Sequence, residues 1–192
     1  MGREFEIKYA ATATSQAAIR QEFADFQTIT METTYFDTAD GALATRMITL
    51  RLRKENCVCI CTLKTPLPDG SRGEWECHAT EIEAGLTQLI REGAPAEIAL
   101  LTKTGLLPVC GAKFTRLATQ VDTADGTAEL ALDKGVLLGG GKEMPLCEIE
   151  VELKTGSETA ALAFAHRLAE KHGLIPEKRS KFRRAMLLAK GD

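Results

Sequence analysis

Charged and apolar side chains alternate along short stretches of this chain, and the first such stretch lies near its start. Residues 4–8 read Glu-Phe-Glu-Ile-Lys, and successive side chains of a β-strand point to opposite faces. A strand here carries two carboxylates and an ammonium on one face and two apolar side chains on the other. Because burying charge is costly unless it meets water, a metal or a charged partner, the strand requires a sheet with one apolar face and one hydrated or liganded face.

Seven further stretches show a comparable pattern. The eight predicted strands cover residues 3–10, 28–37, 45–54, 57–64, 72–81, 113–122, 127–133 and 146–154. Their polarity alternates, whereas strands of a parallel sheet are usually continuous apolar runs. The sequence therefore predicts an antiparallel sheet of eight strands.

Amphipathic helices are predicted between and after these strands. They cover residues 16–26, capped by Thr14 or Ser15; 85–102, interrupted at Pro95; 157–172, capped by Ser157; and 180–189, capped by Ser180. We expect a single domain over residues 1–192. Its predicted class is α+β: an eight-stranded antiparallel β-barrel, forming a tunnel, with the helices packed outside.

Composition argues against several classes of protein. A formal net charge of −3 argues against general nucleic-acid binding, which usually requires a basic surface. No apolar run reaches the roughly 18–20 residues that span a bilayer, and we expect no signal peptide. Three of the six cysteines, Cys57, Cys59 and Cys61, alternate along one strand, which fits reduced thiols better than a zinc site. We therefore expect a cytoplasmic protein that binds neither nucleic acid nor a membrane.

The charged faces of the predicted strands carry both signs, in separate groups. One face collects Glu4, Glu6, Lys8, Arg51, Arg53, Lys64, Arg72, Glu74, Glu76, Arg116, Glu129, Asp133, Glu148, Glu150 and Glu152. On any single strand such a face would ordinarily meet solvent. Here the helices need the apolar face, so we expect the charged face to line the inside of the barrel as a water-filled binding site.

The two signs suit two components of one ligand. Carboxylates on the first and last strands are hard oxygen ligands that suit Mg²⁺ or Mn²⁺. Arginine and lysine on the middle strands suit phosphate oxygens. A metal-bound polyphosphate would neutralise both groups at once.

Seven short motifs resemble, in order, those of the CYTH domain. They are Glu-x-Glu-x-Lys at 4–8, Tyr-Phe-Asp-Thr at 35–38, Leu-Arg-Leu-Arg at 50–53, Thr-Leu-Lys at 62–64, Glu-x-x-x-Asp at 129–133, Glu-Ile-Glu-Val-Glu-Leu at 148–153 and Ser-Lys-Phe-Arg at 180–183. This domain belongs to the triphosphate tunnel metalloenzymes, which include inorganic triphosphatases, thiamine triphosphatases and class IV adenylyl cyclases. The resemblance implies a tunnel that binds a triphosphate with a divalent metal ion.

The resemblance also implies roles for individual residues. The metal ligands would be Glu4, Glu6, Asp133, Glu148 and Glu150, with Glu152 on the same face; the substrate would be bound by Lys8, Arg51, Arg53, Lys64, Arg72, Arg116 and Lys181; and the catalytic residues would be Glu4, Glu6, Lys8 and Lys64. The sequence leaves open whether Glu74 and Glu76 bind metal or orient the arginines. It also leaves open whether Arg179, Arg183 and Arg184 face solvent or the tunnel.

The predicted function is hydrolysis of inorganic triphosphate, a small-molecule substrate, by a metal-dependent triphosphatase that uses Mg²⁺ or Mn²⁺. The alternatives are a thiamine triphosphatase, a class IV adenylyl cyclase that converts ATP to cyclic AMP, and a non-catalytic polyphosphate- or nucleotide-binding module. Recognition of a base or thiazole ring needs suitable groups at the tunnel mouth, and one Trp and two Tyr reveal no such pocket. A pure anion binder gains little from so many carboxylates. The sequence leaves a homodimer open.

Overall fold

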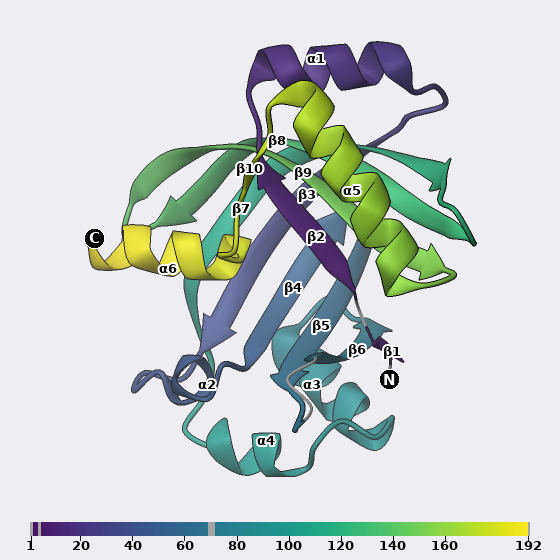
Figure 1. Cartoon of the computed structure of the whole chain (residues 1–192). Coiled ribbons are helices and arrows are strands. Elements are labelled where there is room, and N and C mark those ends of the chain that lie inside the picture. The colour runs from purple at the N-terminus through teal and green to yellow at the C-terminus, as the bar shows by residue number, and fades with distance from the viewer. Residues whose placement is uncertain (1, 4, 69–71, 192) are drawn as a thin grey trace.

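The computed structural model describes residues 2–3, 5–68 and 72–191. Within them, ten strands form one sheet that is accompanied by six helices (Figure 1). The strands are β1 Gly2–Arg3, β2 Glu6–Ala10, β3 Gln27–Asp37, β4 Thr49–Glu55, β5 Val58–Pro66, β6 Arg72–His78, β7 Leu107–Asp122, β8 Thr127–Gly139, β9 Lys142–Thr155 and β10 Ile175–Pro176. The helices are α1 Ala13–Glu22, α2 Ala42–Thr45, α3 Ile82–Arg91, α4 Glu97–Leu101, α5 Glu158–His172 and α6 Lys181–Lys190.

The strands are hydrogen-bonded in the order β1-β6-β5-β4-β3-β7-β8-β9-β2-β10, and all neighbours are antiparallel, as predicted. The count of ten among the described residues corrects the expected eight. The first predicted strand is divided into β1 and β2, and the two-residue β10 is too short to give a sequence pattern. Strand pairing between described residues does not by itself close the sheet into the expected barrel.

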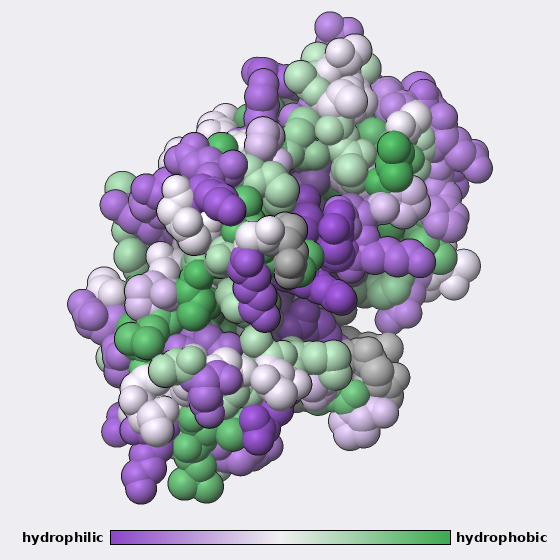
Figure 2. Space-filling model, turned by 90° about the vertical axis from the view of Figure 1, so that its left-hand side faces the viewer, coloured by the Kyte–Doolittle hydropathy of each residue, from purple (hydrophilic) through white to green (hydrophobic). Residues whose placement is uncertain are grey.

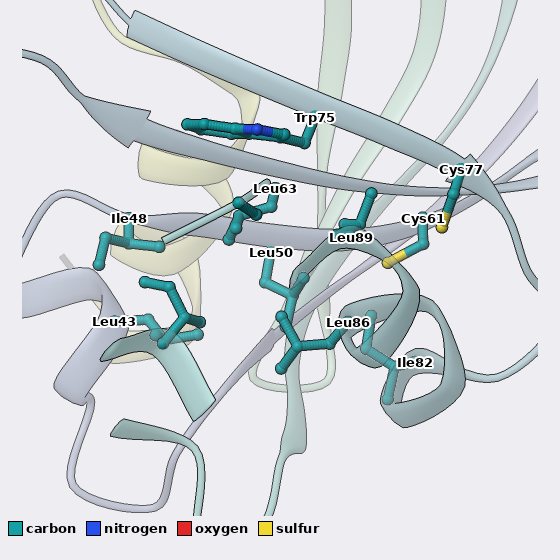
Figure 3. Close-up of a cluster of buried hydrophobic side chains, with 12 residues drawn as sticks. Leu43, Ile48, Leu50, Cys61, Leu63, Trp75, Cys77, Ile82, Leu86 and Leu89 are labelled. Atoms are coloured by element: carbon teal, nitrogen blue, oxygen red, sulfur yellow. The ribbon is translucent and has the colours of Figure 1, made fainter. Parts of the chain in front are cut away.

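One apolar core covers the outer face of β4, β5 and β6. Leu50, Leu63 and Trp75 come from these three strands and pack with Leu86 and Leu89 of α3 (Figure 3). Each strand residue alternates with charged residues of the same strand. The apolar face is therefore covered from outside and the charged side chains point the other way, as predicted.

A second apolar core covers the outer face of β2, β8 and β9. Leu130 of β8 and Ile149 and Val151 of β9 pack with Ile19 of α1 and Leu168 of α5. These β9 residues alternate with the acidic residues of the Glu-Ile-Glu-Val-Glu motif. Helices α1 and α5 thus turn the carboxylates of β8 and β9 towards the inner face.

Helix α6 lies on the inner face of the sheet, which corrects the expectation that all helices pack outside. Its Ala185 packs with Phe114 of β7, Leu137 of β8 and Leu146 of β9, on the strand faces that elsewhere carry charge. The charged face becomes apolar towards one end of these three strands, so a helix can cover it there. Gly139 permits a close approach, because a Cβ at this position would lie 2.3 Å from the Ala185 carbonyl oxygen.

Several element boundaries also differ from the predicted ones. Helix α1 begins earlier than predicted, because Thr12 and Ser15 form a capping box. The long helical pattern before β7 is two helices, α3 and α4, on either side of Pro95. Ser157 and Ser180 cap α5 and α6 as predicted. Among the described residues, no helix has the length and apolar character needed to cross a bilayer.

Candidate active site

A cavity of about 430 Å³ lies on the charged face of the sheet. Its described lining comprises Glu6, Lys8, Ile29, Met31, Tyr35, Thr49, Arg51, Arg53, Glu55, Lys64, Arg72, Glu74, Glu76, Arg116, Glu129, Glu150, Glu152, Lys154, Ser180, Lys181 and Phe182. Figure 2 views the α6 side of the molecule and shows hydrophilic side chains around a hollow near its centre. Eight cationic and seven anionic side chains occur in this lining, so the cavity suits a ligand that carries both signs.

Strand pairing places carboxylates of three strands side by side in this lining. Glu6 of β2 lies opposite Glu152 of β9, which lies opposite Glu129 of β8. Like charges directly opposite each other destabilise a sheet, and nearby cations offset them here. Lys8 Nζ lies 2.5 Å from Glu6, and Lys154 Nζ lies 2.8 Å from Glu152. These three carboxylates face the cavity, where they could bind a further cation.

A second group of carboxylates, Asp133, Glu148 and Glu150, forms what we call the acidic cluster. One oxygen of each lies within 4.8 Å of the others. Glu150 lines the cavity, whereas Asp133 and Glu148 lie behind its lining with 0% exposure. Gln16 of α1 donates Nε2 hydrogen bonds of 2.9 and 3.0 Å to the backbone carbonyls of Asp133 and Glu148. The glutamine therefore supports β8 and β9 where the acidic cluster lies.

Two cations from the sheet neutralise the acidic cluster. Arg116 of β7 donates two hydrogen bonds of 2.8 Å to Asp133 and a third to Glu150. Bidentate arginine–carboxylate pairs are among the stronger hydrogen-bonded pairs in proteins. Lys8 of β2 lies 3.2 Å from Glu150. Because Lys8 also contacts Glu6, it links the acidic cluster to the carboxylate row in the cavity.

Helix α6 supplies two further cations. Lys181 Nζ lies 2.8 Å from Asp133 and 2.7 Å from Glu150, and it also contacts Glu148. Arg184 follows three residues later and contacts the other carboxylate oxygen of Glu148. Both side chains are buried. The docking of α6 thus completes the charge balance of the acidic cluster.

The network of charges shifts the pKa values of its members. Burial alone would raise the pKa of Glu150, but Lys181, Lys8 and Arg116 hold it well below its usual range. Burial disfavours the charged forms of Lys8 and Lys181, yet neighbouring carboxylates, above all Glu150, raise the pKa of both. Burial raises the pKa of Glu148 against the opposing effect of Lys181. Glu150 and its cations therefore stay charged near neutral pH.

The opposite side of the cavity is a cationic wall, formed by Arg51 and Arg53 of β4, Lys64 of β5 and Arg72 of β6. Lys64 Nζ lies 3.1 Å from Glu74, and Arg51 lies 3.9 Å from the same residue. The pKa of Arg53 is lowered, first by burial and then by repulsion from Arg51 and Arg116. An anion in the cavity would relieve this repulsion, because opposite charge favours the protonated form.

Comparison with known proteins identifies the family. A family model described as the CYTH domain matches residues 2–186. This chain belongs to the CYTH domain family. Among curated proteins, the inorganic triphosphatase of Haemophilus influenzae is 30% identical to it, over 98% of this chain and 55% of the relative. The chain therefore spans about half the length of that curated relative.

Solved structures share the CYTH domain fold. A putative adenylyl cyclase from Hippeastrum, described as having a dominant triphosphatase activity, matches with a TM-score of 0.64 and 20% identity, over 98% of this chain and 96% of its own. A protein of Pyrococcus horikoshii has the same TM-score and identity and is covered to 99%. A putative adenylate cyclase of Bacillus halodurans has a TM-score of 0.63 at 20% identity, over 95% and 98% of the two chains. At this level of identity, the likeness concerns the fold alone.

The structure brings most of the predicted site residues of this CYTH domain to one cavity. Its lining includes Glu6, Lys8, Arg51, Arg53, Lys64, Arg72, Arg116, Glu150 and Lys181. Asp133 and Glu148 lie behind the lining, and Glu4 is outside the described residues. Glu74 and Glu76, whose roles the sequence leaves open, both line the cavity and lie 3.9 and 3.7 Å from Arg51. The roles of all these residues stay predictions.

Two charged residues of the described lining, Glu55 and Lys154, are absent from the predicted set. Arg184, whose orientation the sequence leaves open, is buried against Glu148. The period of two could have found the first pair, because Glu55 follows Arg53 by two positions and Lys154 likewise extends the acidic motif of β9. Arg184 lies three residues after Lys181, on the same side of a helix. Arg183, between them, is exposed.

The donor set of the cavity fits Mg²⁺ or Mn²⁺, which prefer carboxylate oxygens. Glu6 and Glu150 offer such oxygens from the lining. The acidic cluster offers a second group, but a metal ion that reached Asp133 and Glu148 would have to displace Lys181. The described residues thus offer two places where carboxylates could hold an ion, one at the cavity lining and one behind it.

Proposed function

We propose that this CYTH domain hydrolyses inorganic triphosphate with the help of a divalent metal ion, Mg²⁺ or Mn²⁺. One observation carries the proposal: a single cavity has the cationic wall on one side and carboxylates of β2, β8 and β9 on the other. Cations match phosphate oxygens and carboxylates match metal ions, so a metal triphosphate satisfies both sides. The relatedness to an inorganic triphosphatase of Haemophilus influenzae supports the same substrate.

In this proposal, the phosphate chain is held by the cationic wall together with three cations of the opposite side. The proposed substrate-binding residues are Lys8, Arg51, Arg53, Lys64, Arg72, Arg116 and Lys181, all in the lining. Guanidinium groups bind phosphate oxygens in a planar, two-point manner, and ammonium groups act as compact charges. Lys8 and Lys64, on opposite sides of the cavity, stabilise the negative charge that develops on the transferred and leaving phosphates.

The proposed metal ligands are Glu4, Glu6, Asp133, Glu148 and Glu150. The lining position of Glu6 and Glu150 supports a first ion near the substrate. When bound, a divalent ion neutralises phosphate charge and makes water a better nucleophile for in-line attack on a terminal phosphorus. Glu6 and Glu150 both contact Lys8, so the same carboxylates orient a phosphate-binding ammonium.

We also propose that the sheet closes around the substrate as a tunnel. β1 pairs with β6, and β2 pairs with β9. The N-terminal segment that contains β1 and β2 therefore pairs with strands near both ends of the strand order. Only residues 4 and 5 separate β1 from β2, and the Phe5 carbonyl accepts a 3.0 Å hydrogen bond from the Leu153 amide. This continuity supports closure through the covalent chain, although no strand pairing between described residues joins β1 to β2.

The aromatic residues favour inorganic triphosphate over a substrate with a ring. Trp75 lies in the outer core of β4–β6 (Figure 3) and not in the cavity lining. Tyr35 is buried, and its ring packs on Phe182 with centroids 5.1 Å apart. The two rings of the lining are thus engaged with each other. Inorganic triphosphate requires no stacking platform.

We further propose that residues 1–192 act as one domain in a cytoplasmic setting. One sheet carries all three apolar cores, which supports a single folding unit. The six cysteines are free thiols, which fits a reducing compartment. The net charge of −3 supports a small-molecule partner rather than nucleic acid, and we propose no membrane partner.

A substrate panel tests the proposed function. The protein is incubated with inorganic triphosphate, thiamine triphosphate or ATP, each with Mg²⁺, Mn²⁺ or a chelator, and released phosphate and cyclic AMP are measured together. We expect the fastest phosphate release from inorganic triphosphate, and none with chelator. Formation of cyclic AMP would favour a cyclase, whereas tight binding without turnover would favour a binding module.

Glu6→Gln provides the matched variant for this assay, because it keeps the shape of a proposed metal ligand and removes its charge. We expect metal-dependent turnover to be lost while the fold persists. Glu32→Gln is the control, since Glu32 is exposed and pairs with Lys113 outside the cavity. Full activity of Glu6→Gln would show that the metal assignment is wrong.

A further inference from the structure

Arg184 of α6 is a charged residue that is buried behind the lining of the cavity. The residue is buried with 9% exposure, and its side chain contacts Glu148. It does not belong to the described lining of the cavity, so it has no direct route to a bound substrate. Burying an arginine is costly unless a partner compensates. A role in the site therefore has to pass through Glu148.

Glu148 stands between the two cations of α6. One carboxylate oxygen contacts Lys181 and the other contacts Arg184. The spacing of three residues puts both cations on the same side of the helix, and the fully buried glutamate fills the space between them. Arg184, Glu148 and Lys181 therefore form a continuous chain of contacts from behind the lining to the cavity.

Lys181 is the member of this chain that reaches the cavity. Three carboxylates share its single ammonium: Asp133 at 2.8 Å, Glu150 at 2.7 Å, and Glu148 in direct contact. Arg184 takes up part of the charge of Glu148. If Arg184 were absent, the whole charge of Glu148 would draw the ammonium backwards, away from the lining. We therefore expect the position of Lys181 to depend on a residue that does not belong to the described lining of the cavity.

We propose that Arg184 is a positioning residue, which acts through Glu148 to hold the Lys181 ammonium at the cavity surface for a phosphate oxygen. This inference rests on the proposed function, in which Lys181 binds the triphosphate. It assigns to the second cation of α6 a role distinct from the phosphate-binding role of the first.

Steady-state kinetics of four variants test the proposal: Arg184→Met, Arg184→Lys, Lys181→Met, and the double variant Arg184→Met/Lys181→Met. We expect Arg184→Met to raise KM for inorganic triphosphate about tenfold, the effect of weakening one hydrogen bond to a charged group, with a smaller change in kcat. Arg184→Lys keeps the charge and should restore most of the affinity. Arg183→Met, at the exposed neighbouring position, is the matched control and should leave KM unchanged.

The double variant separates positioning from general damage to the fold. If Arg184 acts through Lys181, Arg184→Met adds little to KM once Lys181 is methionine, because coupled residues are not additive. An equal rise of KM in both backgrounds would overturn the proposal. Circular dichroism and thermal unfolding identify any variant that fails to fold, in which case Arg184→Lys carries the test.

A second readout does not depend on turnover. Acetylation of lysines, followed by mass spectrometry, compares the reactivity of Lys181 with that of exposed Lys178 in the same sample. We expect Lys181 to be labelled at a different rate relative to Lys178 in Arg184→Met than in the wild type and Arg183→Met; an unchanged ratio overturns the proposal. If the wild type hydrolyses no triphosphate, the proposed function fails, while this labelling still tests the position of Lys181.

Discussion

The two charged sides of the cavity handle buried charge in different ways. The acidic cluster is matched by cations at hydrogen-bond distance, including the two 2.8 Å bonds between Arg116 and Asp133. In the cationic wall, Lys64 and Arg53 pair with Glu74 and Glu55 at 3.1 and 3.4 Å, and Arg51 lies 3.9 and 3.7 Å from Glu74 and Glu76. The acidic cluster is held by a bidentate arginine pair, whereas Arg53 of the cationic wall is repelled by Arg51 and Arg116.

This difference separates stability from ligand binding. Removing one member of a matched buried pair leaves a buried charge without compensation, so the acidic cluster should be costly to disrupt. The cationic wall contains repulsion that lowers the pKa of Arg53, so it should gain from an anion. Functional sites often hold such unfavourable charge, at some cost in stability. Four measurements test whether the two sides differ in this way.

The largest expected effect is that of Asp133→Asn on stability. The change removes the carboxylate that pairs with Arg116 and Lys181, and breaking a buried pair typically costs about 3–5 kcal/mol. Urea unfolding monitored by circular dichroism measures the loss. Glu76→Gln is the control, because its side chain is 48% exposed and exposed pairs contribute about 0–1 kcal/mol. Equal losses in both variants would break the contrast.

Triphosphate itself should stabilise the protein through the cationic wall. A ligand at one hundred times its Kd stabilises the folded state by about 2.7 kcal/mol, which thermal unfolding detects as a rise in Tm. We expect a rise with inorganic triphosphate and Mg²⁺, and a much smaller one in Arg53→Met. If Arg53→Met showed the full rise, the cationic wall would not be the phosphate-binding side.

Gln16→Leu should destabilise the two strands that carry the acidic cluster. The change leaves the backbone carbonyls of Asp133 and Glu148 without the Gln16 donor, at a cost of about 1–3 kcal/mol for a buried acceptor. Urea unfolding again gives the measurement. Gln21→Leu, at an exposed position of the same helix, serves as control. A loss of stability no greater than that of the control would show that the Gln16 hydrogen bonds contribute little to the free energy of unfolding.

The smallest expected effect is that of Arg53→Met on unfolding without ligand. Burial and repulsion from Arg51 and Arg116 already disfavour the charge of Arg53. Its removal also ends a 3.2 Å hydrogen bond to Thr33 and a 3.4 Å ion pair with Glu55, so we expect a change of about 1 kcal/mol in the free energy of unfolding, while KM for triphosphate rises. A loss of stability as large as that of Asp133→Asn would show that Arg53 stabilises the fold. The two sides of the cavity would then not differ in their contribution to stability.

The sequence predicts the sheet and its lining because both follow a period of two. Charged residues at alternate positions on β2, β4, β6 and β9 reach the cavity, and the apolar residues between them form the outer cores. The same period also explains Glu55 and Lys154. The period of two determines which residues of a strand face the cavity, and strand pairing then sets where they lie relative to those of the next strand.

Other features could not be predicted, because they depend on contacts across the fold. The pattern of α6 indicates which residues are buried but not which face of the sheet buries them, so the inner position of Ala185 is not visible in the sequence. Gln16 belongs to no repeated pattern, and its role depends on two carbonyls more than one hundred positions away. β10 has two residues, too few for any periodic signal.

The inner position of α6 also has a consequence for the order in which the protein folds. Lys181 reaches carboxylates on β8 and β9, and these strands in turn pair with β7 and β2. The pairing of β2 with β9 joins residues at the two ends of the chain, and such contacts form slowly, because closing long loops costs entropy. During synthesis, β9 leaves the ribosome before α6, so a nascent chain can bury its outer apolar surfaces while the acidic cluster still lacks two of its cations. The cavity is therefore expected to become competent only after α6 has docked on the inner face.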